Sequence, residues 1–363
     1  MTSLLIVGAG PTGLTAAVEL ARRGLIARII DKKSDPLPLS RAVGINAHSL
    51  TLLEASGVAE RLLAAGIRVR ELLIHDRGQL ISRIRLDRED LPYNFMLALP
   101  QDETETILRA RLEELGGRVE FGVALEDLAI EGTQAQATLK HAADGRLEEA
   151  AYDLVLGTDG VRSTVRQAAA LPFEGFDLPG AWGVADVESA AWPHQQRACL
   201  FMLSQGGIVV VVPIGTDRYR IVANRPKALE VVPTGLSVDH LRREAEFEIS
   251  IRQVSAYGAG PVFLAGDAAH CHSPAGGRGM NLGITDAASF ARRLTGESPG
   301  NGLAGYSAER HGHGRETIRL SENLRRTMTR ENAVARWLIR GGLRLVGRTP
   351  ALQKRLARQV LDI

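Results

Sequence analysis

Cysteine is scarce in this sequence, and its scarcity excludes several kinds of chemistry. The 363 residues include two cysteines, Cys199 and Cys271, whose spacing forms neither a CxxC pair nor any other disulfide or metal-binding framework. Structural disulfides belong to oxidising compartments, so their absence is typical of a reducing one. We therefore expect two free thiols, a cytoplasmic protein and no metal site.

Long apolar runs and a one-sided charge are also lacking. No hydrophobic run approaches the ~18 residues of a membrane-spanning helix, and the segment after Met1 has neither the basic region nor the cleavage site of a secretion signal. With 44 basic and 42 acidic residues the net charge is +2, although 12 basic and 4 acidic residues lie between 315 and 363. We expect a soluble protein that binds no nucleic acid and does not insert stably into a membrane.

Glycine, by contrast, is abundant. The 38 glycines, with 45% hydrophobic and 24% charged residues, are typical of an α/β protein with many tight turns between strands and helices. The chain is longer than one simple core usually holds, which predicts one large composite domain or two that pack closely. Short apolar runs at 4–7, 152–157 and 262–266 indicate buried strands, and the stretch 171–255 is rich in β-like segments.

The first glycine-rich segment lies between a predicted strand and a predicted helix. Residues 8–13 read Gly-Ala-Gly-Pro-Thr-Gly, directly after the apolar run 4–7. An amphipathic helix is predicted at 13–23, and a second strand at 26–30 ends next to Asp31. This order of strand, glycine-rich turn, helix, strand and acid is typical of nucleotide-binding units.

Each part of the segment has a mechanical reason to be there. Gly8 permits the tight turn, Gly10 lets a pyrophosphate approach the backbone, and Gly13 lets the helix and strand pack closely. The helix N-terminus offers amides and a positive dipole to phosphate. Asp31 can accept hydrogen bonds from a ribose. The segment predicts a nucleotide cofactor without separating FAD from NAD.

A second pattern favours FAD. The buried strand predicted at 262–266 is followed by Asp267, by a glycine-rich loop and by a helix predicted from about Gly279 to Leu294. Asp267 can hold hydroxyls of a polyol such as a ribityl chain, and the amides of residues 279–281, at the start of the helix, can stabilise negative charge. A reduced flavin carries such charge at N1 and its O2 carbonyl.

A third motif completes a resemblance to a known family. Residues 157–166 read Gly-Thr-Asp-Gly-Val-Arg-Ser-Thr-Val-Arg, and with the segments at 8–13 and 266–267 they resemble, in order, the three fingerprints of the para-hydroxybenzoate hydroxylase family, the group A flavoprotein monooxygenases. Lesser matches are Ser-Arg-Ala at 40–42, Leu-Pro-Gln at 99–101 and Tyr-Ser-Ala-Glu-Arg at 306–310. The resemblance covers residues 1 to about 320 and is weakest at 171–255.

The resemblance implies a Rossmann-like α/β FAD-binding fold, with a parallel sheet and a small antiparallel sheet. We expect the FAD-binding domain to be discontinuous, to carry an inserted β-rich substrate domain and to end in basic helices. The predicted bounds are 1–70, 96–170 and 256–325 for the FAD-binding domain, 71–95 and 171–255 for the substrate domain, and 326–363 for the C-terminal helices.

The resemblance also assigns residues to the cofactor. It makes Arg41 and Gln101 FAD contacts, in addition to the ligands of the ADP half. It places Asp267 on the ribityl chain, Pro274 beside the isoalloxazine and the 279–281 amides at its O2 edge. Asp159 and Arg166 belong to a motif associated with both FAD and the nicotinamide cofactor. The expected FAD contacts are Gly8, Gly10, Pro11, Thr12, Gly13, Asp31, Lys32, Arg41, Gln101, Asp159, Asp267, Pro274, Gly277, Gly279, Met280 and Asn281.

The activity implied is hydroxylation of a small aromatic or polycyclic substrate by a monomer or homodimer. NADH or NADPH would reduce FAD, O2 would add at C4a, and the resulting hydroperoxide would transfer one oxygen to the ring. No catalytic residue is assigned, and the flavin-side candidates are Arg41, His270 and Pro274. A reductase of the same superfamily, or a flavoprotein that binds a metabolite without turning over NAD(P)H, stays open, whereas the Trp-x-Trp-x-Ile-Pro signature of halogenases is absent.

Several other residues are consistent with either a structural or a functional role. His270 and His272 flank Cys271, but no matching acid accompanies them, so we predict a packing role for His270 and keep a flavin-side role open for either. Trp182 and Trp192 are equally consistent with an aromatic pocket and with core packing. Residues 336–348 predict a basic amphipathic helix, expected to pack on the body with its basic face in solvent, while membrane-surface attachment and a dimer contact stay open.

Overall fold

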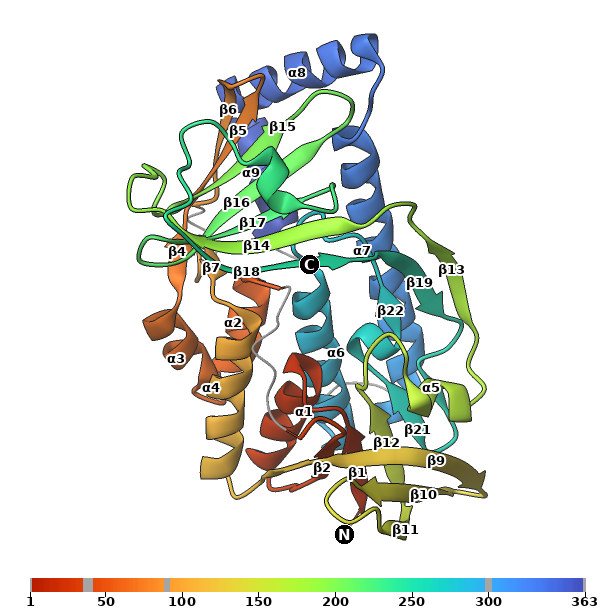
Figure 1. Ribbon diagram of the computed structural model, residues 1–363. Helices are drawn as coiled ribbons and strands as arrows, with labels where there is room; N and C mark the ends of the chain where they lie inside the picture. Colours follow the sequence, from red (N-terminus) through yellow and green to blue (C-terminus); the bar gives the residue numbers. More distant parts are fainter. Residues whose placement is uncertain (1, 35–41, 88–91, 298–301, 362–363) are drawn as a thin grey trace.

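The computed structural model describes residues 2–34, 42–87, 92–297 and 302–361. The molecule is elongated, and its two main sheets lie in different halves (Figure 1). A mostly parallel sheet with its helices occupies the lower half of the view, and a seven-stranded sheet occupies the upper half. The long helix α7 runs along one side, and α8 lies across the upper end.

The lower sheet has the strand order β20-β21-β12-β1-β2-β8. All neighbours in it are parallel except β20, which pairs antiparallel with β21 at the edge. β1 and β21 are buried along their whole length, as expected of parallel strands covered on both faces. The bounds are β1 (Leu4–Val7), β2 (Arg28–Asp31), β8 (Val119–Phe121), β12 (Leu154–Gly157), β20 (Gly258–Ala259) and β21 (Val262–Leu264).

The register of this sheet brings the three sequence motifs together. Val7, at the end of β1, pairs with Gly157 at the end of β12, and Gly157 pairs with Leu264 at the end of β21. Each motif begins at one of these positions or within two residues after it. Because parallel strands end at the same edge, the motifs lie side by side at the carboxyl edge of the sheet, where ligands of open α/β sheets bind.

Helices flank the lower sheet, and α1 packs against both α4 and α6. The sequence predicted α1 from Gly13, but the helix begins at Pro11, because the fixed φ of proline suits the first helical position and its missing amide needs no partner there. The bounds are α1 (Pro11–Ala21), α2 (Ala47–Glu54), α3 (Val58–Ala65), α4 (Gln101–Glu114), α5 (Thr164–Ala168) and α6 (Gly279–Leu294).

Smaller elements connect the two halves. One small sheet has the order β13-β19-β22. In the chain, β13 follows the third motif, β19 follows the last strand of the upper sheet, and β22 follows the Gly-Asp motif. Its strands are β13 (Phe173–Asp177), β19 (Ser250–Val254) and β22 (His270–Cys271). A second small sheet consists of β3 (Gly44–Ile45), β7 (Met96–Ala98) and β4 (Ile67–Val69). A third consists of β11 (Leu147–Tyr152), β10 (Gln134–His141) and β9 (Val123–Glu131). The 3-10 helices are η1 (Ala228–Val231), η2 (Gly266–Ala268) and η3 (Gly302–Gly305).

The upper sheet unites segments that are far apart in the sequence. A hairpin turns at Arg77 and Gly78, which both have positive φ, and its strands β5 and β6 join those of the β-rich stretch through a parallel β5-β15 pair. The order is β18 (His240–Phe247), β14 (Trp182–Glu188), β17 (Arg218–Ala223), β16 (Ile208–Gly215), β15 (Arg197–Met202), β5 (Glu71–Asp76) and β6 (Gln79–Arg85). The substrate domain and its bounds stay a prediction.

The C-terminal segment forms the helices α7 (Tyr306–Met328), α8 (Ala333–Arg348) and α9 (Pro350–Leu361). Helix α8 packs on the body as expected, with Leu343 buried and Arg344 and Arg348 exposed, but the expectation that its whole basic face lies in solvent is wrong. Arg336 and Arg340 turn inward to the buried carboxylate of Asp76, while Trp337 and Leu338 are exposed. The reason is electrostatic, because a carboxylate that is only 3% exposed is costly to bury without cations, and α8 supplies two.

Candidate functional site

The glycine loop after β1 has the geometry that its residues require. Gly8 has φ +105°, a conformation that side chains disfavour, and a Cβ on Gly13 would lie 2.0 Å from the carbonyl oxygen of Gly8. Gly10 differs, because a Cβ there would meet nothing within 4 Å. Two glycines thus serve packing inside the protein, and Gly10 borders open space at the N-terminus of α1, where a pyrophosphate fits.

Side chains from neighbouring strands hold this loop. Asp31 accepts hydrogen bonds from the Ala9 amide through Oδ2 (2.8 Å) and from the Lys33 amide through Oδ1 (2.9 Å). The Thr158 hydroxyl donates to the carbonyl oxygens of Val7 (2.9 Å) and Gly8 (2.8 Å). Asp31 therefore shapes the loop through its own hydrogen bonds, and the third motif supports the first.

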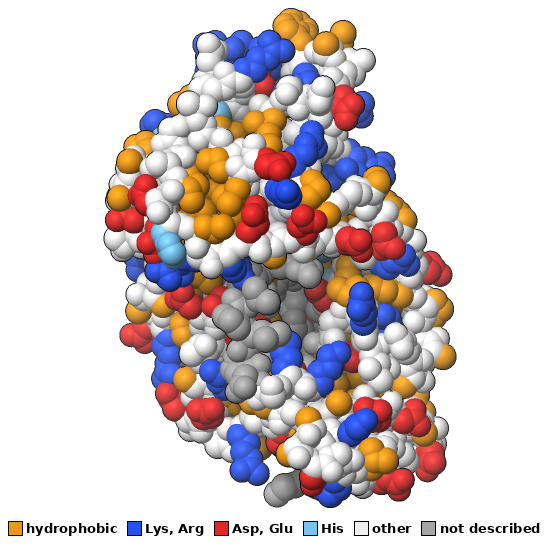
Figure 2. Space-filling view, viewed as in Figure 1, with side chains coloured by type: hydrophobic (Ala, Val, Ile, Leu, Met, Phe, Trp, Pro, Cys, Tyr) orange, Lys and Arg blue, Asp and Glu red, His pale blue; other side chains and the backbone are white. Residues whose placement is uncertain are grey.

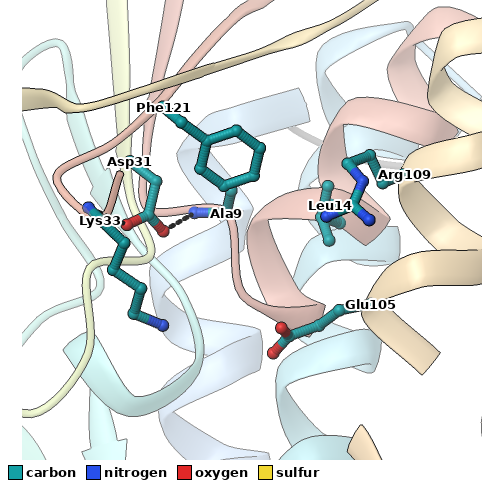
Figure 3. Close-up of a pocket in the computed structure, with 7 residues that line it drawn as sticks. All are labelled: Ala9, Leu14, Asp31, Lys33, Glu105, Arg109 and Phe121. Carbon is teal, nitrogen blue, oxygen red and sulfur yellow. Dashed lines mark hydrogen bonds between the residues drawn. The ribbon is translucent and has the colours of Figure 1, made fainter. Parts of the chain in front are cut away.

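A pocket opens beside the loop, between β2 and α4 (Figure 3). Asp31 and Lys33 border it on one side and Glu105 and Arg109 of α4 on the other. Lys32, predicted to contact FAD, is exposed and does not line this pocket. The lining residues are Ala9, Leu14, Asp31, Lys33, Glu105, Arg109 and Phe121.

Glu105 and Arg109 of α4, which line this pocket, were not predicted from the sequence, although their spacing could have indicated them. Gln101 donates to Glu105 (2.8 Å), so the predicted residue lies one helical turn from the pocket. Burial raises the pKa of Glu105. Gln101, Glu105 and Arg109 are four residues apart, which puts them on one face of a helix. That periodicity would have identified Glu105 and Arg109 once Gln101 was chosen.

A buried ionic cluster centred on Asp286 of α6 holds the Gly-Asp motif in place. Oδ2 of Asp286 accepts from the Gly266 amide (2.9 Å) and from Nε2 of His270 (2.7 Å), and Oδ1 accepts from Nε of Arg310 (2.6 Å). Asp286 and His270 are fully buried and Arg310 is 1% exposed. Burial alone would raise the pKa of Asp286, but Arg310 and His270 outweigh it and lower that pKa. Asp286 thereby holds the turn that presents Asp267.

This cluster corrects one expectation about His270. The sequence showed no acid to match it, whereas Asp286, sixteen residues later on α6, is bonded to its ring. The signal was obscured because the two residues are brought together only by the packing of α6 against η2, which precedes β22. Among the described residues, no group of three or more histidine, cysteine or acidic side chains gathers in a way that could hold a metal ion.

The loop before α6 is tied to the segment at 44–46. The Asn281 side chain accepts from the Asn46 amide (2.9 Å) and donates to the carbonyl oxygens of Gly44 (2.9 Å) and Gly277 (2.9 Å). This residue was predicted as a cofactor contact through its amide, and the clamp by its side chain was missed. The clamp fixes the amides of Gly279 and Met280 at the start of α6, beside the half-buried Pro274.

A buried cation lies in the same loop. Arg278 is 5% exposed, and its Nη2 donates to the Gln359 carbonyl at the end of α9 (2.6 Å). Its Nε and Nη1 have no hydrogen-bond partner in the described part of the chain. Burial lowers its pKa, with no acidic side chain acting against it. A buried guanidinium without a counter-charge is costly, so its position calls for an anionic or strongly polar ligand.

The third motif is braced internally. Asp159 accepts from the Ser163 hydroxyl (2.5 Å) and the Thr164 amide (2.7 Å) at the start of α5. Arg166 donates to the Ala268 carbonyl (2.9 Å) and stacks over Phe173, 4.0 Å from the ring centre. Both residues therefore position the motif next to η2.

The upper sheet reaches the same region through Arg220. Its Nη1 donates to the Ala42 carbonyl (3.1 Å), and its Nε and Nη2 pair with the Asp186 carboxylate (both 2.7 Å). Arg41, the neighbouring candidate, lies outside the described residues. Trp192 belongs to the core of this sheet, and Trp182 packs in the core while also bordering a separate pocket with Asn224 and Arg325.

Comparisons with known proteins agree with this geometry. The sequence profile of the FAD binding domain family matches residues 1–234 and 225–321. The chain belongs to this family of FAD-binding proteins. The resemblance to the para-hydroxybenzoate hydroxylase type is thereby confirmed, and the residues present fit the cofactor, with open space at Gly10 and a polar pocket beside Asp31.

The relatives of this FAD-binding protein include more than one kind of enzyme. The 6-methylpretetramide 4-monooxygenase of Streptomyces rimosus is 34% identical over 99% of this chain and 68% of its own length. The dialkyldecalin synthase of Streptomyces rugosporus is 31% identical over 86% of this chain and 70% of its own length. Across eight curated relatives, the chain spans 61 to 70% of their length.

A solved structure shows that the fold is shared over the whole chain. The p-nitrophenol 4-monooxygenase PnpA from Pseudomonas putida DLL-E4 superposes with a TM-score of 0.90, covering 99% of this chain and 97% of that one at 21% identity. None of the helices in the described ranges combines the length and the hydropathy needed to cross a membrane.

Two glycine substitutions separate cofactor binding from packing. Gly10→Ala should leave the stability of the apoprotein unchanged but weaken FAD binding at least tenfold, because its methyl group enters the open space only. Gly13→Ala should cost about 1–3 kcal/mol of stability because it overpacks the contact with Gly8. Urea unfolding and FAD titration measure both, and equal FAD affinity in Gly10→Ala and wild type would contradict the assignment.

The buried His272 should make the stability of the folded protein depend on pH. Burial lowers its pKa to about 4, below the ~6.5 of an exposed imidazole, so between these values the unfolded chain binds more protons and stability falls as the pH falls. From pH 7 to 5 the loss is about 2 kcal/mol. His272→Asn, which keeps a donor for the Ser273 carbonyl, should lose that much less by urea unfolding. An identical pH dependence of both proteins would reject this.

Proposed function

We propose that this protein is an FAD-dependent monooxygenase that uses O2 and NADH or NADPH to hydroxylate a small aromatic or polycyclic compound. The observation that carries the proposal is the meeting of the three motifs at one edge of the parallel sheet, beneath a second sheet that the chain supplies. A relative named as a monooxygenase of 6-methylpretetramide, similar over 99% of the chain, supports the reaction class and the polycyclic substrate.

The cofactor would extend along this edge. Its pyrophosphate would lie over Gly10 at the start of α1, and its adenosine half beside Asp31 and Glu105. Asp267 would hold the ribityl chain, and the amides of 279–281 would face the O2 edge of the ring, next to Pro274. When bound, FAD supplies the redox chemistry with NAD(P)H and O2. The protein's task is to orient the substrate, exclude water and control protons.

Arg278 is the residue we assign to the substrate side. It lies in the loop before α6, against the end of α9, and its Nε and Nη1 are buried donors without a partner among the described residues. A cation there would favour the ionised form of a phenolic substrate, and an ionised ring is richer in electrons and therefore easier to hydroxylate. The hydrogen bond from Arg278 to Gln359 would place α9 in the wall of the substrate site.

A second candidate function has support of its own. The relative named dialkyldecalin synthase is 31% identical over 86% of the chain, and its name denotes no hydroxylation. The same arrangement of FAD-binding motifs would then serve a protein that binds a metabolite without consuming NAD(P)H. The two candidates differ in one measurable property, the reduction of the flavin.

The test is the visible spectrum of the FAD-loaded protein during anaerobic addition of NADH or NADPH. We expect the flavin absorption to bleach, and at least one phenol in a panel to accelerate bleaching, because group A enzymes are expected to couple reduction to substrate binding. Matched methyl ethers of the same phenols should have little effect, since they cannot ionise.

The outcome separates the candidates. Bleaching followed by oxygen-dependent formation of a hydroxylated phenol establishes the monooxygenase. A yellow protein that neither nucleotide bleaches, with every phenol tried, overturns that reading and favours the metabolite-binding candidate.

A further inference from the structure

The helix α8 carries an apolar face that the rest of the described chain leaves open. Val334, Trp337, Leu338 and Leu345 are 67%, 70%, 59% and 57% exposed, and their spacing places them on one side of the helix. Gly341 and Gly342 lie among them, with nothing within 4 Å of the positions their Cβ atoms would take. We call these six residues the α8 face. Figure 2 shows hydrophobic and basic side chains together along the upper edge, where Figure 1 places α8.

The opposite side of α8 explains how the helix is held. Leu343 is buried against Ile84 and Leu361 in one cluster, and a Cβ on Gly347 would lie 2.7 Å from the Ser82 hydroxyl. Arg336 and Arg340 pair with Asp76 on the same side. The described residues thus anchor α8 through this opposite side, and the apolar side chains of the α8 face stay more than half exposed.

We propose that the α8 face binds the α8 face of a second copy of this chain, with the two helices antiparallel. A twofold axis between positions 339 and 340 sets Leu338 against Gly341 of the second copy, Trp337 against Gly342 and Val334 against Leu345. Large side chains therefore meet glycines, and the same contacts form twice, as an isologous interface requires. The glycines let the helix backbones approach closely enough for the large side chains to pack.

Charge supports the antiparallel direction. Glu331 precedes the helix and Arg348 ends it, and both are exposed. The same twofold axis sets Glu331 of each copy against Arg348 of the other. A parallel pair would instead align Arg344 and Arg348 of the two copies and repel, and it would align the helix dipoles unfavourably.

The contact extends beyond one helix. A specific interface buries about 800 Å² on each partner, which exceeds what the α8 face offers. Leu80 is 49% exposed and lies on β6 two residues from Ser82, which contacts α8. The end of the β5-β6 hairpin therefore adds to the surface that the second copy covers.

A lipid surface is the competing occupant. The stretch 330–361 has eight basic residues and one acidic residue, which suits anionic lipid. The α8 face itself argues for the protein partner, because two glycines at its centre add little to membrane insertion but provide recesses for a second helix. The vesicle measurement below decides between the two.

The experiment measures the mass of the FAD-loaded full chain by size-exclusion chromatography with light scattering at micromolar concentration. Wild type should have twice the monomer mass of 39.1 kDa. Leu338→Arg should have the monomer mass, because it puts a charge against Gly341. The control Leu147→Arg, at a residue 61% exposed on β11, should stay dimeric.

Charge reversal tests the register independently of apolar burial. Glu331→Arg and Arg348→Glu should each weaken the dimer at least threefold in dissociation constant, and the double variant should restore it. Because both residues are on the surface, no variant should change the unfolding temperature of the monomer, measured at a concentration where wild type is also dissociated.

Several outcomes overturn the proposal. These are a wild type of monomer mass throughout the micromolar range, a Leu338→Arg variant that dimerises like wild type, and a double charge variant weaker than either single one. A monomer that co-sediments with phosphatidylglycerol vesicles, but not with phosphatidylcholine vesicles, overturns it in favour of the lipid surface.

Discussion

The carboxylate of Asp286 is the point on which the arrangement of the site depends. Its two oxygens bind the backbone of the Gly-Asp turn, the ring of His270 and the guanidinium of Arg310, so α6, η2, β22 and α7 are joined at one buried group. A buried charge network stabilises only while every member is satisfied, and loss of one member leaves uncompensated charge. The position of Asp267 at the cofactor edge follows from this network and not from the local turn alone.

The other contacts of the site transmit this position outward. Thr158 ties the third motif to the glycine loop, and Asn281 ties the loop before α6 to residues 44–46. Arg220 then joins the upper sheet to the same region through the Ala42 carbonyl. Segments from five parts of the chain are thereby held in fixed positions around the predicted cofactor site. This is the pre-organisation that a cofactor enzyme needs.

Much of this could be predicted from the sequence because the decisive signals are local. A buried strand, a glycine-rich turn and a helix start lie within a few residues of each other, so their order fixed the nucleotide-binding unit and the helix from Gly279. The parallel sheet then brought the three motifs to one edge, since strands of this kind end together. The roles of Gly8 and Gly13 followed from backbone geometry alone.

The features that escaped prediction depend on contacts between distant segments. Asp286 is an ordinary acid on a helix until α6 packs against η2, and Arg278 is an ordinary loop cation until its hydrogen bond to the end of α9 forms. The inward turn of Arg336 and Arg340 on α8 escaped prediction because amphipathicity does not show where the body holds a buried carboxylate, here Asp76. Such pairings become visible only when the tertiary structure supplies both partners.

The role of Asp286 is tested by the FAD dissociation constant of Asp286→Asn, with Asp177→Ala as the control, which removes a surface carboxylate paired with Arg252. Asparagine keeps the shape of Asp286 but removes the charge that balances Arg310. The account predicts that the variant still unfolds cooperatively, yet binds FAD about 10 to 100 times more weakly, a difference of about 1.4 to 2.7 kcal/mol, while Asp177→Ala binds like wild type. An Asp286→Asn protein with wild-type FAD affinity would contradict the claim that this buried carboxylate positions the cofactor edge.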